Sequence, residues 1–389
     1  MPTLDAIDLI KSAIKKILRT SFLPLEPTDR SACRGLVPNI REEIPYFSDA
    51  ILPDLRNDSE LDSSSVKIEP WDDELVQHIG VDVRLGDEVW VSDTLTRLNP
   101  NNAASFLQAA KHHKIGNSFI CQPDPRGQKI YYFLTHERIR TPPLIEYKVD
   151  SRSTTGRVGC MSHQASNGDI FDGRILIALQ PYAFPIEVIP EKTSVSQVVF
   201  RYAGTSYLTQ DETRKAWGKD IAFYENENLI PLESRLKADR LELRFSTKRV
   251  YRARRTDQPI DLTKVDQYNP HDFFEELEGN DQFTLEPHNF YLLGTRETIS
   301  LGKLCAELSR ENSNVGTGLW SHFAGFFMPG FSGEGTLECW TPVRRIIYDG
   351  DPAGLITLDK VLTSKEIEFK GPYQHQKAPR LPKMFKSAS

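Results

Sequence analysis

One segment of the chain combines two arginines with three hydroxyl side chains. It reads VDSRSTTGRVG, and its polar centre consists of Arg152, Ser153, Thr154, Thr155, Gly156 and Arg157. Two guanidinium groups beside hydroxyls suit a chain of phosphates, and the glycine lets the backbone approach such a ligand. The same composition is also typical of a polar turn between two strands. Both interpretations remain open on these residues alone.

A second segment, HFAGFFMPGFSGEGTLECW, runs from His322 to Trp340. Its aromatic and small residues, with a Pro-Gly turn, suit the wall of a flat pocket. Glu338 follows among apolar neighbours. If its carboxylate is buried, desolvation raises its pKa and makes it a possible general base. The alternative is an ordinary strand on which Glu338 faces solvent.

Several other chemistries are excluded by missing motifs. A zinc deaminase needs H-x-E followed by P-C-x-x-C, and neither half occurs. The chain also has no G-x-x-x-x-G-K-[ST] phosphate loop, no G-x-G-x-x-G and no G-x-S-x-G elbow. Its five cysteines form no C-x-x-C pair, which favours neither disulfides nor a structural zinc site. We therefore expect no zinc and no metal ligand from the protein.

The composition limits the kinds of partner that the protein is expected to bind. The net charge of −6 disfavours nucleic acid as a partner but leaves room for a small anion held by local arginines. No apolar run is long enough for a membrane helix, and the N-terminal sequence does not resemble a secretory signal. We expect no membrane partner and a cytoplasmic location.

The chain contains an internal duplication. VDVRLG at Val81–Gly86 resembles LELRFS at Leu241–Ser246, and YYFLTHERI at Tyr131–Ile139 resembles YLLGTRETI at Tyr291–Ile299. Soon after each second match comes SRS in the first half and SRE in the second. Three matches in the same order at nearly constant spacing indicate two related units in tandem.

The matched segments have the alternation and β-branched content of strands, separated by Gly, Pro, Asn and Asp. Helices are expected only over Leu4–Leu18, Asp211–Lys219 and Pro270–Leu277. The sequence therefore predicts a mainly β protein made of two barrel-like or jelly-roll units with a few short helices. We expect an N-terminal helix and irregular extension over 1–75, repeat 1 over 76–203, a connector over 204–228 and repeat 2 over 229–389.

Four motifs resemble those of the dCTP deaminase and dUTPase superfamily. HFAGFFMPGFSG with the later TLE is similar to the deaminase signature H-x-T-A-G-x-I-D-P-G-F-x-G-x-x-x-L-E, and SRSTTGR resembles R-S-S-x-x-R, which dUTPases share. LEPHNFYLLGTRE resembles L-x-P-G-E-F-x-L-x-x-T-x-E, and YQHQ resembles the tail motif K-Y-x-x-Q. The resemblance extends from about Val81 to the C-terminus. The tandem arrangement resembles that of the bimodular bacterial deaminases.

This resemblance implies dUTPase-like (β-clip) units and hydrolytic deamination of dCTP to dUTP and ammonia. It implies that a glutamate activates water without zinc, that Mg²⁺ accompanies the triphosphate, and that the repeats pack with threefold symmetry in a homo-oligomer. The catalytic residues implied are Glu338, Arg157 and Ser153. The residues implied for binding the deoxynucleoside triphosphate are Arg152, Thr154, Thr155, His322, Ala324, Gly325, Phe326, Tyr373 and Gln376.

The departures from the family pattern are equally specific. In repeat 1 the position of the catalytic glutamate falls on Ala178, and in repeat 2 the phosphate motif carries Glu311 and Val315 instead of serine and the second arginine. Met328 replaces the aspartate of the base-side signature, and Pro372 replaces the lysine of the tail. One hybrid site per chain, with phosphate residues from repeat 1 and base residues from repeat 2, fits this pattern.

Three functions remain in play. The leading hypothesis is a dCTP deaminase. The alternatives are a dUTP pyrophosphatase or combined deaminase-pyrophosphatase, whose chemistry needs the aspartate that Met328 replaces, and a nucleotide-binding or regulatory relative that kept the fold without the reaction.

Overall fold

A computed structural model of the chain describes residues 46–47, 66–77, 79–93, 103–141, 145–164, 172–202, 207–316, 318–362, 369 and 371–386. The helix expected over Leu4–Leu18 lies outside these residues, as does most of the predicted extension. Within the ranges described, no helix combines the length and the apolar character needed to cross a membrane.

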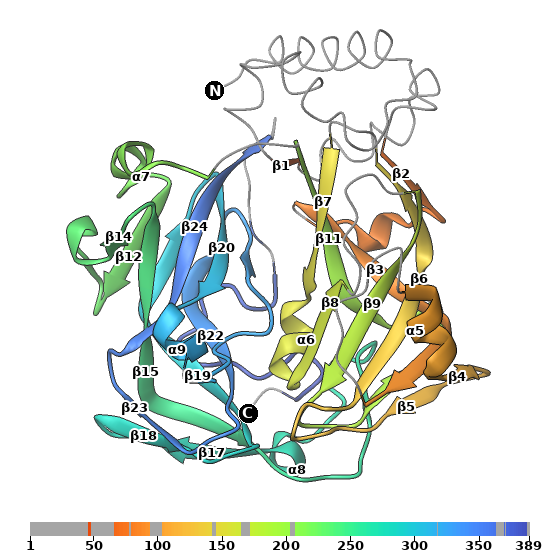
Figure 1. The fold of residues 1–389 in the computed structure, drawn as a ribbon. Helices are drawn as coiled ribbons and strands as arrows, with labels where there is room; N and C mark the ends of the chain where they lie inside the picture. Colours follow the sequence, from red (N-terminus) through yellow and green to blue (C-terminus); the bar gives the residue numbers. More distant parts are fainter. Residues whose placement is uncertain are drawn as a thin grey trace, which may run out of the picture.

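Repeat 1 is built mainly from antiparallel strands (Figure 1). The short elements before it are β1 (Tyr46–Phe47), β2 (Lys67–Glu69) and the 3-10 helix η2 (Asp73–Leu75). Its strands are β3 (Gly80–Ser92), β4 (Lys111–Lys114), β5 (Phe119–Cys121), β6 (Ile130–Arg140), β7 (Ile145–Ser151), β8 (Cys160–Gln164), β9 (Asp172–Pro181), β10 (Ile186–Val188) and β11 (Ser194–Tyr202). Its helices are α5 (Ala103–Ala109) and α6 (Ser153–Arg157).

The part of the chain made of the predicted connector and repeat 2 has the same character. Its strands are β12 (Ile221–Glu225), β13 (Asn228–Leu229), β14 (Leu236–Lys237), β15 (Arg240–Ala253), β16 (Ile260–Asp261), β17 (Phe274–Glu278), β18 (Gln282–Leu285), β19 (Phe290–Leu301), β20 (Leu304–Arg310), β21 (Phe326–Phe327), β22 (Ser332–Trp340), β23 (Arg345–Tyr348) and β24 (Pro352–Leu362). Its helices are α7 (Gln210–Ala216), η3 (Leu232–Ser234), α8 (Pro270–Phe273) and α9 (Asn312–Gly316). The predicted mainly β fold with short helices is confirmed.

Two helix predictions had different outcomes. The helix expected over Asp211–Lys219 is α7, which begins with a capping box between Thr209 and Glu212. The helix expected over Pro270–Leu277 is wrong beyond Phe273, because the chain continues as β17 and pairs with β15. The competition for backbone hydrogen bonds from a neighbouring strand outweighs local helix propensity there.

The duplication is confirmed by strand pairing. In repeat 1, β6 pairs with β3 and β9, and β11 pairs with β3 and β7. In repeat 2, β19 pairs with β15 and β22, and β24 pairs with β15 and β20. The register agrees as well, since Tyr132 opposes Ala178 in repeat 1 and Leu292 opposes Glu338 in repeat 2. Ala178 is therefore the structural counterpart of Glu338.

Each repeat has its own apolar core, and corresponding positions fill both. The fully buried residues of the first core include Val83, Phe133, Ile177 and Val198, and their counterparts in the second core are Leu243, Leu293, Leu337 and Ile356. Because side chains alternate along a strand, these apolar positions fix which face of each strand points inward. The polar positions between them can then face the neighbouring repeat.

Several segments connect the repeats, which lie side by side (Figure 1). The strand β16 leaves repeat 2 to pair in parallel with β10 of repeat 1. The short β1 pairs with both β11 and β24. Strands outside the two predicted repeats also pair with them. In the predicted extension β2 pairs with β6 of repeat 1, and in the predicted connector β12 pairs with β19 of repeat 2. The predicted division into segments itself stays a prediction.

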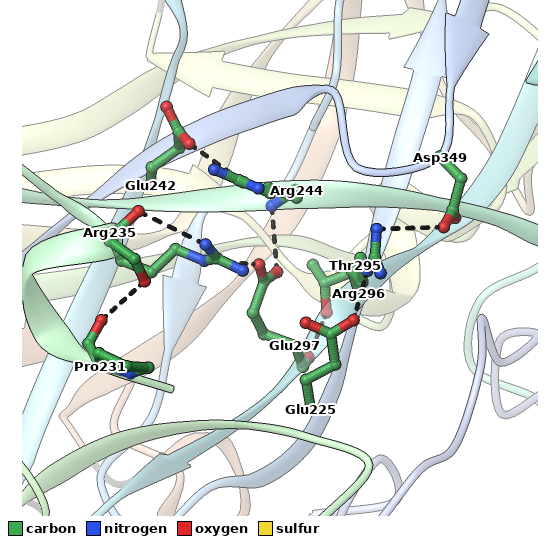
Figure 2. A network of polar contacts seen from close by, with 10 residues as sticks. Glu225, Pro231, Arg235, Glu242, Arg244, Thr295, Arg296, Glu297 and Asp349 are labelled. Atoms are coloured by element: carbon green, nitrogen blue, oxygen red, sulfur yellow. Dashed lines mark hydrogen bonds and ion pairs between the residues drawn. The ribbon is translucent and has the colours of Figure 1, made fainter. Parts of the chain in front are cut away.

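Both repeats also bury an acid that ties strands together. Glu137 accepts from the backbone N–H of Arg84 and pairs with its guanidinium, with an Nε–Oε1 distance of 2.7 Å. In repeat 2, Glu297 accepts from the backbone N–H of Arg244 at 3.0 Å, but Arg235 supplies the guanidinium (Figure 2). Both repeats therefore keep a buried glutamate that accepts from the same strand position, but the arginine that pairs with it comes from a different place in the chain.

Candidate active site

A cavity of about 260 Å³ lies between the two repeats. Repeat 1 contributes α6 and the polar ends of β3 and β11, repeat 2 contributes β22 and the segment before it, and the C-terminal tail closes one side. The structure brings together nine of the twelve residues predicted for the site: Arg152, Ser153, Thr154, Arg157, Ala324, Phe326, Glu338, Tyr373 and Gln376. Their separation in the sequence shows that the cavity exists only because the repeats meet.

Glu338 lies on β22 and is only 1% exposed, so the interpretation of a solvent-facing glutamate is wrong. Its neighbours Leu337 and Cys339 point into the core of repeat 2, which turns Glu338 toward repeat 1. Its Oε2 accepts a hydrogen bond from the backbone N–H of Phe323 at 3.1 Å. Burial raises the pKa of Glu338 to about 7, although the Arg157 guanidinium and the Phe323 N–H oppose the rise. Such a carboxyl can exchange a proton near neutral pH.

The arginine and hydroxyl segment forms the short helix α6 instead of a polar turn. Arg152 precedes the helix with extended backbone angles, and its carbonyl accepts from the N–H of Gly156 at 3.0 Å. The helix ends at Arg157, and two residues later Gly159 has a φ of +67°, a left-handed conformation that favours glycine. A side chain at that position would also collide with Ala183. This turn fixes the direction in which α6 points at repeat 2.

Arg157 is buried and holds the C-terminal tail. Its guanidinium donates to the backbone carbonyl of Arg380 at 2.6 Å, to Gln376 Oε1 at 3.3 Å and to Ser153 Oγ at 3.2 Å. It also lies over the ring of Tyr373, 3.8 Å from the ring centre. Arg157 therefore links the tail to the helix that faces Glu338.

Arg152 lies at the other end of α6 and is paired with an acid. Its Nε is 3.0 Å from Oδ2 of Asp82, which also accepts from Gln77 Nε2 at 3.2 Å. Burial raises the pKa of Asp82 to about 6, against the opposing effect of Arg152. The ion pair places one positive and one negative group at the same wall of the cavity.

The tail residues predicted to close the site are firmly bound to the cavity wall. Tyr373 Oη is 3.1 Å from the hydroxyl of Thr154 in repeat 1. Gln376 Nε2 donates to the hydroxyl of Thr336 at 3.1 Å and to the backbone carbonyl of Glu334, both on β22. The tail thus contacts both repeats at once.

The segment before β22 is held by an acid from repeat 1. The backbone N–H of Gly325 donates to Asp150 Oδ2 at 2.8 Å, and its carbonyl accepts from the N–H of Leu308 at 2.7 Å. Burial raises the pKa of Asp150 to about 6. This pair of bonds places Ala324 beside Glu338 in the cavity.

Three predicted residues do not reach the cavity wall: Thr155, His322 and Gly325. Thr155 points away from the cavity side of α6 and is fully buried, and its hydroxyl has no hydrogen-bond partner among the described residues. Gly325 faces Asp150 through its backbone, so its contribution is to hold the loop. His322 lies next to Gly325 on the same loop, 3.7 Å from where a Cβ of Gly325 would lie.

The sequence reasoning missed several residues that line the cavity. The polar ones are Gln77, Asp82, Gln197, Thr336 and Lys383, and the large apolar ones are Leu308, Phe327, Phe331 and Phe369. Asp82 had a usable signal, because an acid stands there inside the otherwise apolar start of the duplicated VDVRLG segment. Gln77, which precedes β3, and Gln197, which lies within β11, carry no signal, since single glutamines are ordinary surface composition.

The equivalent position in repeat 1 has apolar surroundings. Ala178 packs in an apolar cluster with Ile130, Tyr132 and Leu176, against which Phe106 of α5 also packs. In repeat 2, Val315 on α9 stands where Arg157 stands in repeat 1, and it is 53% exposed. The described residues therefore contain one complete combination of α6-type and β22-type elements.

Two family models match this chain. A model of dCTP deaminase-like proteins matches residues 51–203, and a model of the C-terminal domain of 2'-deoxycytidine 5'-triphosphate deaminase matches residues 234–343. The chain belongs to the dCTP deaminase and dUTPase superfamily. The predicted family resemblance is thereby confirmed.

Two curated relatives are both named as dUMP-forming dCTP deaminases. The one from Streptomyces griseus is 34% identical over 123 residues, which are 29% of this chain and 63% of that protein, so the match spans less than two thirds of its length. The one from Methanobrevibacter smithii is 28% identical over 198 residues, covering 49% of this chain and 97% of that protein. The crystal structure of 2'-deoxycytidine 5'-triphosphate deaminase from Agrobacterium tumefaciens matches with a TM-score of 0.69 and 21% identity, covering 82% of this chain and 99% of that one. At this identity the structural match shows the shared fold.

Proposed function

We propose that this protein deaminates dCTP by hydrolysis and releases dUTP and ammonia. The observation that carries the proposal is Glu338, a buried carboxyl with a pKa raised to about 7 that faces the arginine and hydroxyl helix of the other repeat. Family membership supports the reaction class, and the curated relatives are named for it.

The geometry suits a general-base mechanism. With the triphosphate along α6 and the base toward Ala324 and β22, Glu338 would take a proton from water as the oxygen forms its bond to C4 of cytosine. That proton would pass to N3, onto which the C4=N3 electron pair moves. The remaining hydroxyl proton would pass to the 4-amino group as C4=O forms and the C4–N bond breaks, so that ammonia leaves and uracil remains. A carboxyl with a pKa near the working pH can carry out both proton transfers.

The product is the point at which this proposal departs from the names of the relatives. Forming dUMP also requires water to attack the phosphate chain, which calls for a further base near the phosphates. Met328 lines the cavity where the family signature has aspartate, and the carboxylates that line it are Asp82 and Glu338. Asp82 is already paired with Arg152 at 3.0 Å. These features favour dUTP.

Mg²⁺ would accompany the triphosphate. Within the described part of the chain, no three His, Cys, Asp or Glu residues are grouped so that they could hold a metal ion. The donors near Arg152 are the Asp82 carboxylate and the amides of Gln77 and Gln197. Such a set suits an ion held mainly by phosphate oxygens and water, which neutralises charge on the triphosphate.

One assay tests the reaction and its product. Purified protein is incubated with dCTP or dUTP and Mg²⁺ while ammonia, dUTP, dUMP and pyrophosphate are followed. Ammonia with an equal amount of dUTP supports the proposal. Pyrophosphate and dUMP from dCTP would establish the dUMP-forming reaction instead, and nucleotide binding without ammonia would establish a non-catalytic relative.

Assembly is a separate proposal. We propose a homo-oligomer in which repeats pack with threefold symmetry, because repeat 2 exposes apolar side chains beside α9. The residues are Val315, Val343, Ile346 and Tyr348, each about half exposed. Arg345 donates to Asn314 at 2.8 Å and so joins β23 to α9. Light scattering that shows only monomer at working concentrations would contradict this proposal.

A further inference from the structure

Lys383 belongs to a part of the tail that is fixed in the protein core. The next residues, Met384 and Phe385, are buried in the apolar core of repeat 1. The carbonyl of Lys383 accepts from the N–H of Asp266 at 3.1 Å, and that of Met384 accepts from the N–H of Tyr268 at 3.0 Å. The backbone of Lys383 is therefore held at a defined place beside the cavity.

The side chain of Lys383 lines the cavity on the same side as Arg152 and Asp82. Burial lowers the pKa of Lys383, the nearby Arg152 lowers it further, and Asp82 opposes both effects. Asp82 already forms an ion pair with Arg152. Among the residues that the structure describes, the Lys383 ammonium has no hydrogen bond or ion pair of its own. This wall of the cavity therefore carries two cations, Arg152 and Lys383, and one acid, Asp82.

An unpaired ammonium at a partly buried wall is unfavourable without an anion. Within the described ranges, the acid that acts on it is Asp82, which is shared with a second cation, so pairing between these groups leaves positive charge unbalanced. A chain of phosphates would balance both cations at once, and a fixed lysine would lose little conformational freedom on binding it. At position 372, where the tail motif has a lysine, this chain has Pro372.

We propose that Lys383 binds the phosphate chain of the nucleotide and supplies the tail cation that position 372 lacks. This inference rests on the triphosphate part of the proposed function and deepens it. The lysine is a binding residue that acts on the phosphates, and the proposal gives it no part in the proton transfers at the base.

Lys383→Gln removes the charge and keeps most of the length of the side chain. We expect its affinity for inorganic tripolyphosphate and for dCTP, measured by calorimetry, to fall about tenfold to a hundredfold, as for the loss of a charge-assisted hydrogen bond. Binding of deoxycytidine should change less than about twofold, because it lacks phosphates. Lys383→Arg should restore most of the tripolyphosphate affinity. Matched controls are Lys377→Gln and Lys386→Gln, two exposed tail lysines that do not line the cavity.

Unchanged tripolyphosphate affinity in Lys383→Gln would overturn the inference, as would failure of the wild-type protein to bind tripolyphosphate. An equal loss in Lys383→Arg would also overturn it, because shape and not charge would then matter. Thermal melting of each variant shows whether the fold is kept. If the wild type binds tripolyphosphate through Lys383 but releases no ammonia from dCTP, the inference stands and the proposed deamination fails.

Discussion

Gly156 of repeat 1 packs directly against the carboxylate of Glu338 in repeat 2. A Cβ at Gly156 would lie 3.1 Å from Oε1 of Glu338 and 3.3 Å from the Cβ of Ala324. Both distances are shorter than an ordinary van der Waals contact, so any side chain at this position would push the carboxylate away. Only glycine lets α6 approach Glu338 this closely. The contact joins the two halves of the site at one point.

Gly156→Ala should therefore lower activity while the fold persists. Alanine favours a helix by about 1 kcal/mol over glycine, so α6 itself should not suffer. The added methyl group presses on the carboxylate, and we expect kcat to fall at least about tenfold, since small displacements of reacting groups are costly. The matched control is Gly316→Ala, at the last residue of α9 in repeat 2, where a Cβ would meet nothing within 4 Å. Equal activity in both variants would show that the contact is unimportant.

Glu338→Gln should abolish most of the deamination. The amide keeps the shape of the side chain but cannot accept the proton of water, and removal of a general base costs about 10²–10⁴-fold in rate. Nucleotide binding measured by calorimetry should largely survive. Ala178→Glu should not create a second site, because its surroundings are the apolar cluster of Tyr132 and Phe106. A wild-type rate from Glu338→Gln, or two nucleotides bound per chain, is incompatible with one hybrid site.

Activity should rise with pH through about 7. The pKa of Glu338 is raised to about 7, and a general base must be ionised in the free enzyme, so kcat/KM should increase on the acid side and level off above that pH. A profile that is flat between about pH 5 and pH 8 would exclude Glu338 as the titrating base.

The same shift predicts an effect on stability. Because the pKa of Glu338 in the folded protein lies above its ordinary value of 4.5, the folded state binds the proton more tightly. Its contribution to stability is fully present below about pH 4.5 and is lost as pH rises through about 7. Glu338→Gln should therefore gain stability relative to wild type as pH rises, which denaturant unfolding at pH 5 and pH 8 would measure.

Arg157→Ala should release the tail and weaken nucleotide binding. The variant loses the hydrogen bonds to Gln376 and the Arg380 carbonyl and the contact with the Tyr373 ring. We expect affinity for dCTP to fall at least about tenfold and trypsin to cut faster after Lys377. Arg157→Lys keeps the charge without the planar fork, so it should rescue affinity better than tail protection. Unchanged affinity in Arg157→Ala would mean that this half of the site is misassigned.

Glu297→Ala should destabilise repeat 2 strongly. The change leaves the guanidinium of Arg235 buried without its partner at 3.0 Å (Figure 2). Loss of one partner of a buried pair costs about 3–5 kcal/mol, and the unfolding free energy from denaturant titration would measure it. Glu225→Ala is the control, because its partner Arg296 is partly exposed and also contacts Asp349. That surface pair should contribute about 0–1 kcal/mol. Similar losses from both changes would contradict the assignment.

The sequence by itself determined the duplication and, with it, the pairing of strands. Its constant spacing carries over to the register, so that Ala178 and Glu338 occupy equivalent places opposite Tyr132 and Leu292. Alternation of apolar side chains decides which face of a strand points into its own core. Nine of the twelve residues that the motifs predicted line the cavity, because residue type and spacing are preserved within a motif.

Only the tertiary structure decided what covers the face of a strand that points away from its own core. Alternation turns Glu338 away from the core of repeat 2, but only the packing of α6 against β22 buries it and raises its pKa. Tertiary structure also brings Asp82 and Lys383, which are distant in sequence, to the same wall of the cavity. Local patterns record the propensity and polarity of single strands. Burial between repeats depends on contacts between residues far apart in the chain, and no local pattern encodes them.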